Sequence, residues 1–193
     1  MVGEDNYKNN LAYIIGVSIG DGNLSNPNNR AVRLRITCDL KYKSVISEIS
    51  NSLKQIFPNN KVSLVKRKDN CVDISCYSNK LEEILNWKAK EGSKFKQKVR
   101  VPNWVKENRS FTIKCLKGLF ETDGSIYFDR KYKMANFVTT IPDLSQDIQE
   151  MIQSIGFKHS LQLYKSDNKK TKYTIRITKD IDNFIKTINI NKR

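Results

Sequence analysis

The feature that most constrains the fold is an internal repeat. The segment Gly16-Val17-Ser18-Ile19-Gly20-Asp21-Gly22 matches Gly118-Leu119-Phe120-Glu121-Thr122-Asp123-Gly124 at an offset of 102 residues, since 123 − 21 = 102. The same offset places Ile36-Thr37 on Val138-Thr139 and Ile46, Ile49 and Leu53 on Ile148, Met151 and Ile155, and at an offset of 100 Leu81, Ile84 and Leu85 meet Ile181, Phe184 and Ile185. A register kept through several segments predicts one structural unit used twice.

Hydrophobic periodicity predicts the same order of elements in each half. In the first half we expect a helix over 10–20, two strands of which the second spans 31–38, a helix over 43–57, a hairpin of 61–67 and 71–77, and a helix over 79–88. In the second half we expect a helix over 111–122, strands at 125–129 and 133–140, a helix over 142–155, strands at 160–165 and 172–178, and a helix over 180–188.

This order is αββαββα, and it predicts an α+β fold in which each repeat contains a four-stranded antiparallel sheet. We expect the first repeat at 1–90, a basic linker at 91–109 and the second repeat at 110–193. Asp21-Gly22 is expected to end its helix as a glycine C-cap, and Gly156 to end the helix of the second half.

The charge of the chain favours a polyanionic partner. Lys and Arg number 35 against 20 acidic residues, a net charge of +15. Nucleic acid is the first candidate; an anionic membrane surface is second, without a strongly amphipathic basic helix to lie on it, and a merely basic soluble protein is the plain alternative. No apolar run is long enough to span a bilayer. The polar start does not resemble a targeting peptide, so we expect the cytoplasm of a prokaryote, or an organelle if the gene resides there.

The cysteines and the single histidine exclude some kinds of site. Cys38, Cys71, Cys76 and Cys115 form no C-x-x-C pair, and a closed zinc site needs four ligands at local spacings. We expect Cys38, Cys76 and Cys115, which lie in the apolar phase of their segments, to be buried thiols in a reducing compartment. His159 is the one histidine, and a single histidine argues against a mechanism with a Ser-His or Cys-His nucleophile. We expect His159 on a strand or on the surface.

Asp21 and Asp123 are the candidate catalytic residues. Each lies at the C-terminal end of an apolar helix, where the helix dipole opposes a carboxylate by about 0.3–1 kcal/mol. Small residues four apart, at Gly16 and Gly20 and again at Gly118 and Thr122, would let the two helices pack closely and bring the carboxylates together. Such a pair needs a cation, and oxygen ligands favour Mg²⁺. A single Asp-Gly after a helix is usually only a turn; the repeated pair favours metal-assisted phosphodiester hydrolysis.

The two repeated segments, Ile14 to Gly22 and Leu116 to Gly124, resemble the two copies of the LAGLIDADG motif of homing endonucleases. The stretch Val99-Arg100-Val101-Pro102-Asn103-Trp104-Val105 is also similar to the linker of the monomeric, two-repeat class. The resemblance covers nearly the whole chain. It implies a saddle formed by the two sheets over the major groove of double-stranded DNA, a long and weakly palindromic target, and cleavage to short 3′ overhangs.

The resemblance also implies the roles of particular residues. Asp21 and Asp123 would bind Mg²⁺ with help from the main-chain carbonyls of Gly20 and Thr122; Mn²⁺ would substitute, and Ca²⁺ would bind without supporting cleavage. A basic residue near the scissile phosphate would be Lys94 or Lys96, and its second-half counterpart would fall near Lys192-Arg193.

A sheet face that reads DNA carries polar and basic side chains at alternate positions. The candidates of the first half are Arg30, Arg33, Arg35, Thr37, Ser63, Arg67, Asp73, Ser75 and Tyr77. Those of the second half are Tyr127, Asp129, Lys131, Lys133, Gln162, Tyr164, Lys172, Thr174 and Arg176. The phase of 133–140 is ambiguous, because Ala135 and Phe137 occupy the register of Arg33 and Arg35.

Two other functions remain open. One is a protein on the same fold that binds DNA without cutting it or assists RNA splicing as a maturase. The other is a basic nucleic-acid-binding module that needs no metal.

Overall fold

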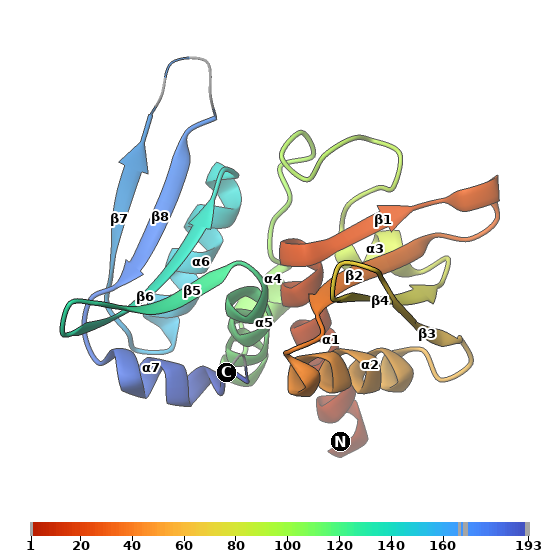
Figure 1. Ribbon diagram of the computed structural model, residues 1–193, viewed down its shortest axis with the longest axis horizontal. Helices are drawn as coiled ribbons and strands as arrows, with labels where there is room; N and C mark the ends of the chain where they lie inside the picture. The colour runs from red at the N-terminus through yellow and green to blue at the C-terminus, as the bar shows by residue number, and fades with distance from the viewer. Residues whose placement is uncertain (1, 166, 168–169, 192–193) are drawn as a thin grey trace.

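The protein, seen in a computed structural model that describes residues 2–165, 167 and 170–191, consists of two similar units on either side of a central pair of helices (Figure 1). The first unit contains α1 (Val2–Asp21), β1 (Gly22–Ser25), the 3-10 turn η1 (Pro27–Asn29), β2 (Arg33–Asp39), α2 (Lys43–Ile56), β3 (Val62–Lys66), β4 (Cys71–Tyr77) and α3 (Leu81–Leu85). The connection between the units carries α4 (Asn103–Lys106). The second unit contains α5 (Arg109–Thr122), β5 (Gly124–Asp129), β6 (Tyr132–Thr139), α6 (Pro142–Ser154), β7 (His159–Tyr164), β8 (Lys172–Ile177) and α7 (Ile181–Ile188).

Each unit contains one four-stranded antiparallel sheet. The strand order is β1-β2-β4-β3 in the first, here sheet A, and β5-β6-β8-β7 in the second, sheet B. The two orders correspond strand by strand, so the α+β fold with two αββαββα repeats and antiparallel sheets is confirmed.

Alternation along the strands gives each sheet a buried face and an open face. In β2, Leu34, Ile36 and Cys38 are buried, whereas Arg33, Arg35 and Thr37 between them are half-exposed. The buried faces pack on α2 and α6, whose apolar residues recur every three or four positions, as in Ile46, Ile49 and Leu53 of α2. We call the opposite face of each sheet its outer face.

Several element boundaries differ from the sequence prediction. The first helix begins at Val2 rather than near residue 10. Glu4 and Asp5 lie in its first turn, where acidic side chains favour a helix, and Glu4 pairs with Lys8 at 3.0 Å. The helix expected at 79–88 spans only Leu81–Leu85, because Asn86 takes a left-handed conformation (φ 59°) and ends it. Gly156 (φ 94°) follows α6, as predicted.

The predicted alignment of Ile36-Thr37 with Val138-Thr139 is wrong by one residue. Gly22 pairs with Ile36 in sheet A, whereas the matching Gly124 pairs with Phe137 in sheet B. The reason is the connection between the strands, because the first unit inserts η1 between β1 and β2 and the second turns directly at Arg130, in a left-handed conformation (φ 55°). This shift resolves the ambiguous phase of 133–140, since Ala135 and Phe137 are fully buried.

Helices α1 and α5 pack backbone against backbone at the centre of the molecule (Figure 1). A Cβ atom added at Gly16 would lie 2.1 Å from the carbonyl oxygen of Cys115, and one added at Gly118 would lie 2.5 Å from that of Tyr13. No side chain fits at such distances, so the close packing expected from the small residues is present. Residues 12–19 are buried all round, as in a helix enclosed on every side.

The glycine after each aspartate is needed for close approach rather than for a left-handed cap. Among the described residues the glycines with positive φ are Gly92 and Gly156, so Gly22 and Gly124 are not left-handed C-caps as expected. A Cβ atom at Gly22 would lie 2.5 Å from the carbonyl oxygen of Ser18, and one at Gly124 2.5 Å from that of Phe120. The chain therefore turns from helix into strand directly against its own helix.

A buried polar network joins the two units around the C-terminal half of α5. The Lys117 ammonium, 2% exposed, donates to both carboxylate oxygens of Glu48 at 2.7 and 2.6 Å. The hydroxyl of Tyr13 and the main-chain N–H of Asn191 each donate to Glu121 at 2.7 Å. Burial raises the pKa of the Glu121 carboxyl, and these two donors and Lys117 oppose the shift. The network ties residue 191 to both units.

The cysteines and the histidine lie as the sequence predicted. Cys38, Cys76 and Cys115 are buried, and Cys71 is half-buried. His159 begins β7 and is half-buried. In the part of the chain that the structure describes, no helix combines the length and the apolar character needed to cross a membrane.

Substitution of Gly118 by Ala tests the helix packing. We expect a loss of about 1–3 kcal/mol or more in the free energy of unfolding, because the added methyl group meets the backbone of α1. Gly3→Ala is the matched control, since nothing lies within 4 Å of that position and alanine favours the helix there by up to about 1 kcal/mol. Denaturant unfolding measures both variants, and equal stabilities would contradict the close packing.

Candidate active site at the helix ends

The ends of α1 and α5 meet between the inner edge strands of the two sheets. Asp21 is the last residue of α1 and Asp123 caps α5, and both side chains are exposed. A Cβ atom at Gly20 would lie 2.0 Å from the Thr122 hydroxyl and 3.4 Å from a carboxylate oxygen of Asp123. The structure therefore brings the two aspartates to one place, as the small residues on the helices suggested.

Lys94 places a positive charge at this junction. Its ammonium donates to the main-chain carbonyl of Ile19 at 2.7 Å and to that of Gly20 at 2.6 Å. Both carbonyls lie in the last turn of α1, where the helix dipole is negative. The junction thus attracts cations through carbonyl oxygens as well as through two carboxylates.

The surroundings of Lys94 shift its titration. Burial lowers the pKa of the Lys94 ammonium to about 8, and the carboxylates of Asp123 and Asp21 oppose this shift. The ammonium also lies 5.6 Å from the centre of the Trp87 ring. A pKa near 8 leaves most of the lysine protonated at neutral pH, so it presents a cation beside the aspartates.

The other predicted basic residues lie elsewhere. Lys96 is exposed, and no hydrogen bond or ion pair joins its ammonium to the described residues. Of the two lysines that the sequence left open, the structure brings Lys94 to the aspartates. The second-half counterpart expected near Lys192-Arg193 lies outside the described residues.

The segment that carries Lys94 is held in place on both sides. The Gln97 amide, three residues after Lys94, donates to the carbonyls of Lys88 and Gly92 before it, both at 2.9 Å. After it, the fully buried carboxylate of Asp147 accepts from the Arg100 guanidinium at 2.7 Å, the Val101 N–H at 2.9 Å and the Lys106 ammonium at 2.7 Å.

Asp147 was missed in the sequence, although a signal was present. It lies between Leu144 and Ile148, on the apolar face that packs α6 against the rest of the protein. A buried carboxylate at such a position needs hydrogen-bond or ion-pair partners, and residues of the basic linker provide them.

The donor set at the junction fits a hard cation. Carboxylate, carbonyl, water and phosphate oxygens are the ligands of Mg²⁺, and the Gly20 carbonyl, an expected ligand, already accepts from a cationic group. The Thr122 hydroxyl donates back into its own helix, to Gly118 and Leu119. Among the described residues no three His, Cys, Asp or Glu side chains cluster as a metal site. Two carboxylates with main-chain oxygens are thus the available set.

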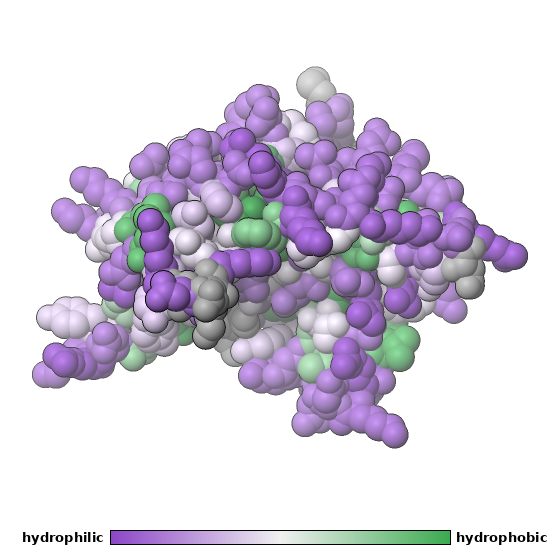
Figure 2. All heavy atoms as spheres, turned by 90° about the horizontal axis from the view of Figure 1, so that it is seen from above, coloured by the Kyte–Doolittle hydropathy of each residue, from purple (hydrophilic) through white to green (hydrophobic). Residues whose placement is uncertain are grey.

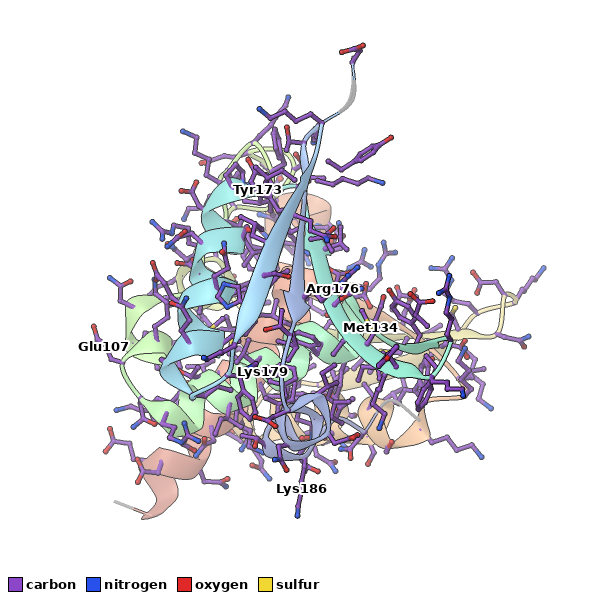
Figure 3. All side chains as sticks on the ribbon, turned by 90° about the vertical axis from the view of Figure 1, so that its left-hand side faces the viewer. Glu107, Met134, Tyr173, Arg176, Lys179 and Lys186 are labelled. Atoms are coloured by element: carbon purple, nitrogen blue, oxygen red, sulfur yellow. The ribbon has the colours of Figure 1, made fainter. Side chains whose placement is uncertain are left out.

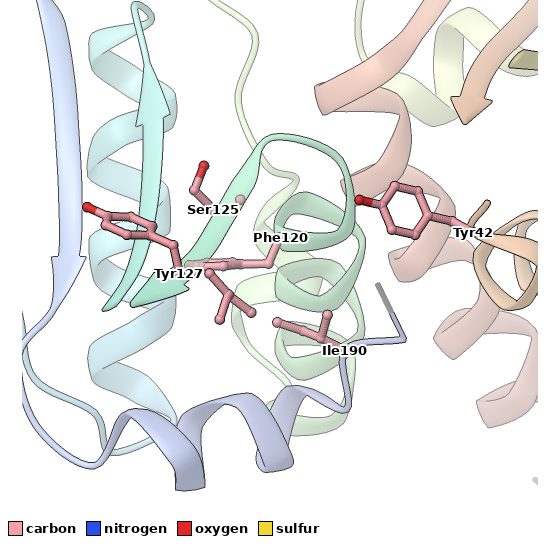
Figure 4. A pocket seen from close by; sticks show the side chains of 7 residues that line it. Tyr42, Phe120, Ser125, Tyr127 and Ile190 are labelled. Carbon is pink, nitrogen blue, oxygen red and sulfur yellow. The ribbon is translucent and has the colours of Figure 1, made fainter. Parts of the chain in front are cut away.

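Two hollows flank the junction. One, of about 400 Å³, lies beside Asp123 and is lined by Lys94, Thr139, Thr140 and Lys172 among others. The other, of about 380 Å³, lies at β5 between Tyr42 and Tyr127 (Figure 4). The first places two lysines next to an acidic residue, an arrangement that suits a phosphate group beside a metal ion.

The outer face of sheet A carries the residues predicted for the first half. Register pairs Arg33 with Tyr77, Arg35 with Ser75, Thr37 with Asp73, and Ser75 with Ser63, so these side chains share one face. Arg67 lies beyond β3 and pairs with Asp73 at 3.6 Å. Arg30 is exposed in the connection after η1.

The outer face of sheet B carries most of the residues predicted for the second half. They are the residues whose side chains alternate with the buried ones: Tyr127, Asp129, Gln162, Tyr164, Lys172, Thr174 and Arg176. Figure 3 shows Arg176 and Met134 on the neighbouring strands β8 and β6. Lys131 lies in the turn between β5 and β6.

The prediction that Lys133 lies on the DNA-binding face is wrong. Lys133 pairs with Phe128 and alternates with the fully buried Ala135, so it points to the helix side of sheet B, where its ammonium contacts Asp182 of α7. The one-residue shift in the hairpin is the cause, and Lys133 leaves the DNA-binding set.

Register also adds outer-face residues that the sequence reading missed. They are Asn23, Ser25 and Val65 on sheet A and Ser125, Met134, Asn136, Val138 and Ser160 on sheet B. Only the strand pairing identifies them, because several are apolar or lie in short strands. Viewed from above, the molecule is mostly hydrophilic with few apolar patches (Figure 2).

Comparisons with known proteins agree with this architecture. A model of the LAGLIDADG-like domain matches residues 110–189, and a model of the WhiA LAGLIDADG-like domain matches residues 10–97. An uncharacterized protein of Methanocaldococcus jannaschii is 23% identical over 173 residues, which cover 87% of this chain and 62% of that protein. The chain therefore spans about three fifths of that relative's length.

Solved structures share the fold at low identity. The crystal structure of I-DmoI in complex with DNA and Mn is 20% identical, with a TM-score of 0.68 over 94% of this chain and 97% of that one. The N-terminal LAGLIDADG domain of WhiA is 13% identical, with a TM-score of 0.62 over 95% of this chain and 84% of that one. With a LAGLIDADG-like domain matched in each half and the same two-repeat fold in these structures, the chain belongs to the LAGLIDADG family and carries both repeats on one polypeptide.

Proposed function

We propose that this protein is a site-specific endonuclease that hydrolyses double-stranded DNA with Mg²⁺ at a long target. The observation that carries the proposal is the meeting of two exposed aspartates at abutting helix ends, with the Lys94 ammonium 2.6 Å from the adjoining Gly20 carbonyl. The outer faces of two sheets flank this junction. A structural relative named as the homing endonuclease I-DmoI has been crystallised with DNA and Mn, Mg or Ca, which supports the proposal.

Each group at the junction has a proposed role. Asp21 and Asp123, with the carbonyls of Gly20 and Thr122, would hold the divalent ions; Mn²⁺ would substitute for Mg²⁺, and Ca²⁺ would support binding only. A bound divalent ion supplies Lewis-acid stabilisation of the phosphate and a more acidic water. Lys94 stabilises the negative charge that develops on the phosphate, because a buried ammonium acts in a medium of low dielectric constant.

The outer faces would bind the DNA. The net charge of +15 provides sequence-independent attraction to phosphates, and alternate side chains on four strands of each sheet reach the major groove. Because both repeats belong to one chain, we propose that a monomer covers the whole target.

A DNA-binding protein that does not cleave, or a maturase, is the second candidate. One of the two matched family models is named for WhiA rather than for a homing endonuclease, so the fold alone does not establish cleavage. The discriminating feature is the junction, since both carboxylates and the lysine serve no evident purpose in binding alone.

Replacing either aspartate by asparagine tests the proposed endonuclease activity. The target is first selected from a random duplex library in Ca²⁺. We expect the wild type to cut both strands in Mg²⁺, and Asp21→Asn and Asp123→Asn each to lose cleavage or only nick, because a carboxylate ligand is lost while the outer faces are intact. Gel assays of binding and cutting provide the measurement.

Asp5→Asn is the matched control, since Asp5 is an exposed acid in the first turn of the same helix as Asp21. It should bind and cut like the wild type. Tight binding by the wild type without cutting in any divalent metal would exclude the endonuclease and favour the second candidate.

Substitution of the two linker lysines tests the choice between them. We expect Lys94→Met to slow cleavage by about 10²-fold or more at unchanged binding, because it removes a charge aimed at the phosphate. Lys96→Met should cut at nearly the wild-type rate, because the Lys96 side chain is exposed on the linker. Single-turnover rates measure both, and a larger defect in Lys96→Met would contradict the proposed role of Lys94.

A further inference from the structure

We infer that the first unit carries a docking groove for an acidic, amphipathic helix of a partner protein. The groove lies on the helix side of sheet A, opposite its outer face, between α2 and the edge strand β3. The inference goes beyond the proposed function, since it involves neither the helix junction nor the outer faces.

The groove is a hollow of about 650 Å³ with an apolar lining. The apolar residues that line it are Leu40, Ile46, Leu64 and Val72. Register pairs Leu64 with the fully buried Ile74, so the Leu64 side chain points to the helix side of sheet A, yet it is 49% exposed. Leu64 therefore extends the apolar side of the sheet beyond the part that α2 covers.

The hollow is not a consequence of the repeated fold. At the repeat offset of 102, Ser47 and Ser50 of α2 correspond to Gln149 and Ile152 of α6. Ile152 is fully buried, and the Gln149 side chain is hydrogen-bonded at 3.2 Å to the ring of His159, at the start of β7. The second unit thus fills with two larger side chains the positions at which the first unit has serines.

Three lysines surround the hollow. Lys43 and Lys54 lie on α2, and Lys66 ends β3. None of the three ammonium groups forms a hydrogen bond or an ion pair with the described residues, and the described residues that line the hollow include no acid. At the positions of Lys43 and Lys54 the second unit has Ser145 and Gly156. The positive charge therefore belongs to the groove and not to the repeat.

The length and the charge of the groove favour a helix as its occupant. Lys43 and Lys54 are three turns apart on α2, which corresponds to about 16 Å. A helix of three to four turns that lies along α2 would bring carboxylates to both lysines and aliphatic side chains onto Leu64. Carboxylates opposite unpaired ammonium groups give an interface its electrostatic complementarity.

A nucleic-acid strand matches this groove less well. Sites for single-stranded nucleic acid combine basic residues with aromatic side chains on which the bases stack, and the described residues that line the hollow include no aromatic one. Phosphates would pair with the lysines but leave Leu64 and Val72 without an apolar partner. An acidic helix with one aliphatic face matches both the charge and the apolar surface.

Binding of a synthetic helix to the full chain tests the inference. The probe is a fluorescein-labelled peptide of about 15 residues, with leucine at the a and d positions of each heptad and mostly glutamate elsewhere. The control peptide has alanine in place of each leucine, which keeps its charge and its helix propensity. Excess random-sequence duplex DNA in Ca²⁺ occupies the outer faces. By fluorescence anisotropy, we expect the leucine peptide to bind about 10-fold or more tightly than the control peptide.

Variants of the groove separate docking from general electrostatic attraction. Ser50→Ile installs the residue of the second unit, fills the hollow without changing the charge, and should weaken binding of the leucine peptide about 10-fold or more. Lys54→Glu should weaken it by a similar factor. Lys186→Glu is the matched control, because Lys186 is an exposed lysine on α7 of the other unit (Figure 3), and it should bind as the wild type does. Thermal unfolding checks that each variant folds, and Leu64→Ser, at a half-exposed position, provides a second test of the apolar lining.

Three outcomes would overturn the inference. Equal binding of the two peptides, or wild-type binding by both Ser50→Ile and Leu64→Ser, would mean that charge alone holds the peptide. Displacement of the leucine peptide by duplex DNA would place it on the outer faces. Single-stranded RNA that displaces the peptide, and that binds Lys54→Glu more weakly than Lys186→Glu, would assign the groove to RNA. The assay needs no cleavage, so each outcome leaves the proposed endonuclease activity to its own test.

Discussion

The backbone contact between α1 and α5 is the constraint on which the rest of the structure depends. Gly16 and Gly118 face the backbone of the opposite helix at distances where no side chain fits. Because the helices touch along this line, their ends coincide, and Asp21 and Asp123 emerge at one point. Each helix is followed at once by the inner strand of its sheet, so the same contact also sets the two outer faces on either side of the aspartates.

Electrostatic forces at the junction oppose one another. Two carboxylates at the negative ends of two helix dipoles repel and are disfavoured, whereas the Lys94 ammonium and the basic surface attract them. The lysine is buried at a cost that the lowered pKa reflects. Arg100, Val101 and Lys106 hold their segment on Asp147, so the linker is part of the site and not only a connection between repeats.

The repeat, the order of elements and the polar face of β2 could be predicted, because they follow from periodic patterns that are local in the chain. The register of β6 could not, since one residue fewer in the β5–β6 connection reverses which side chains face outward. This single difference explains why Lys133 was assigned to the wrong face and why Val138 and Met134 were missed.

The choice between Lys94 and Lys96 and the role of Asp147 also lay beyond the sequence. Both depend on how an irregular linker folds over helices distant in the chain, and no periodicity encodes such a path. The paired aspartates could be predicted from the sequence because the motif that carries them occurs twice.

The buried network around Lys117 makes the two repeats chemically unequal. In the repeat alignment Lys117 and Glu121 correspond to Ile15 and Ile19, so one motif helix contributes charges and the other contributes aliphatic side chains. A chimera that joined two second repeats would bury two lysines and two glutamates at its central seam, each in need of a partner such as Glu48 or Tyr13. Any exchange of the second repeat would have to move Tyr13, Glu48 and the segment around Asn191 together with α5.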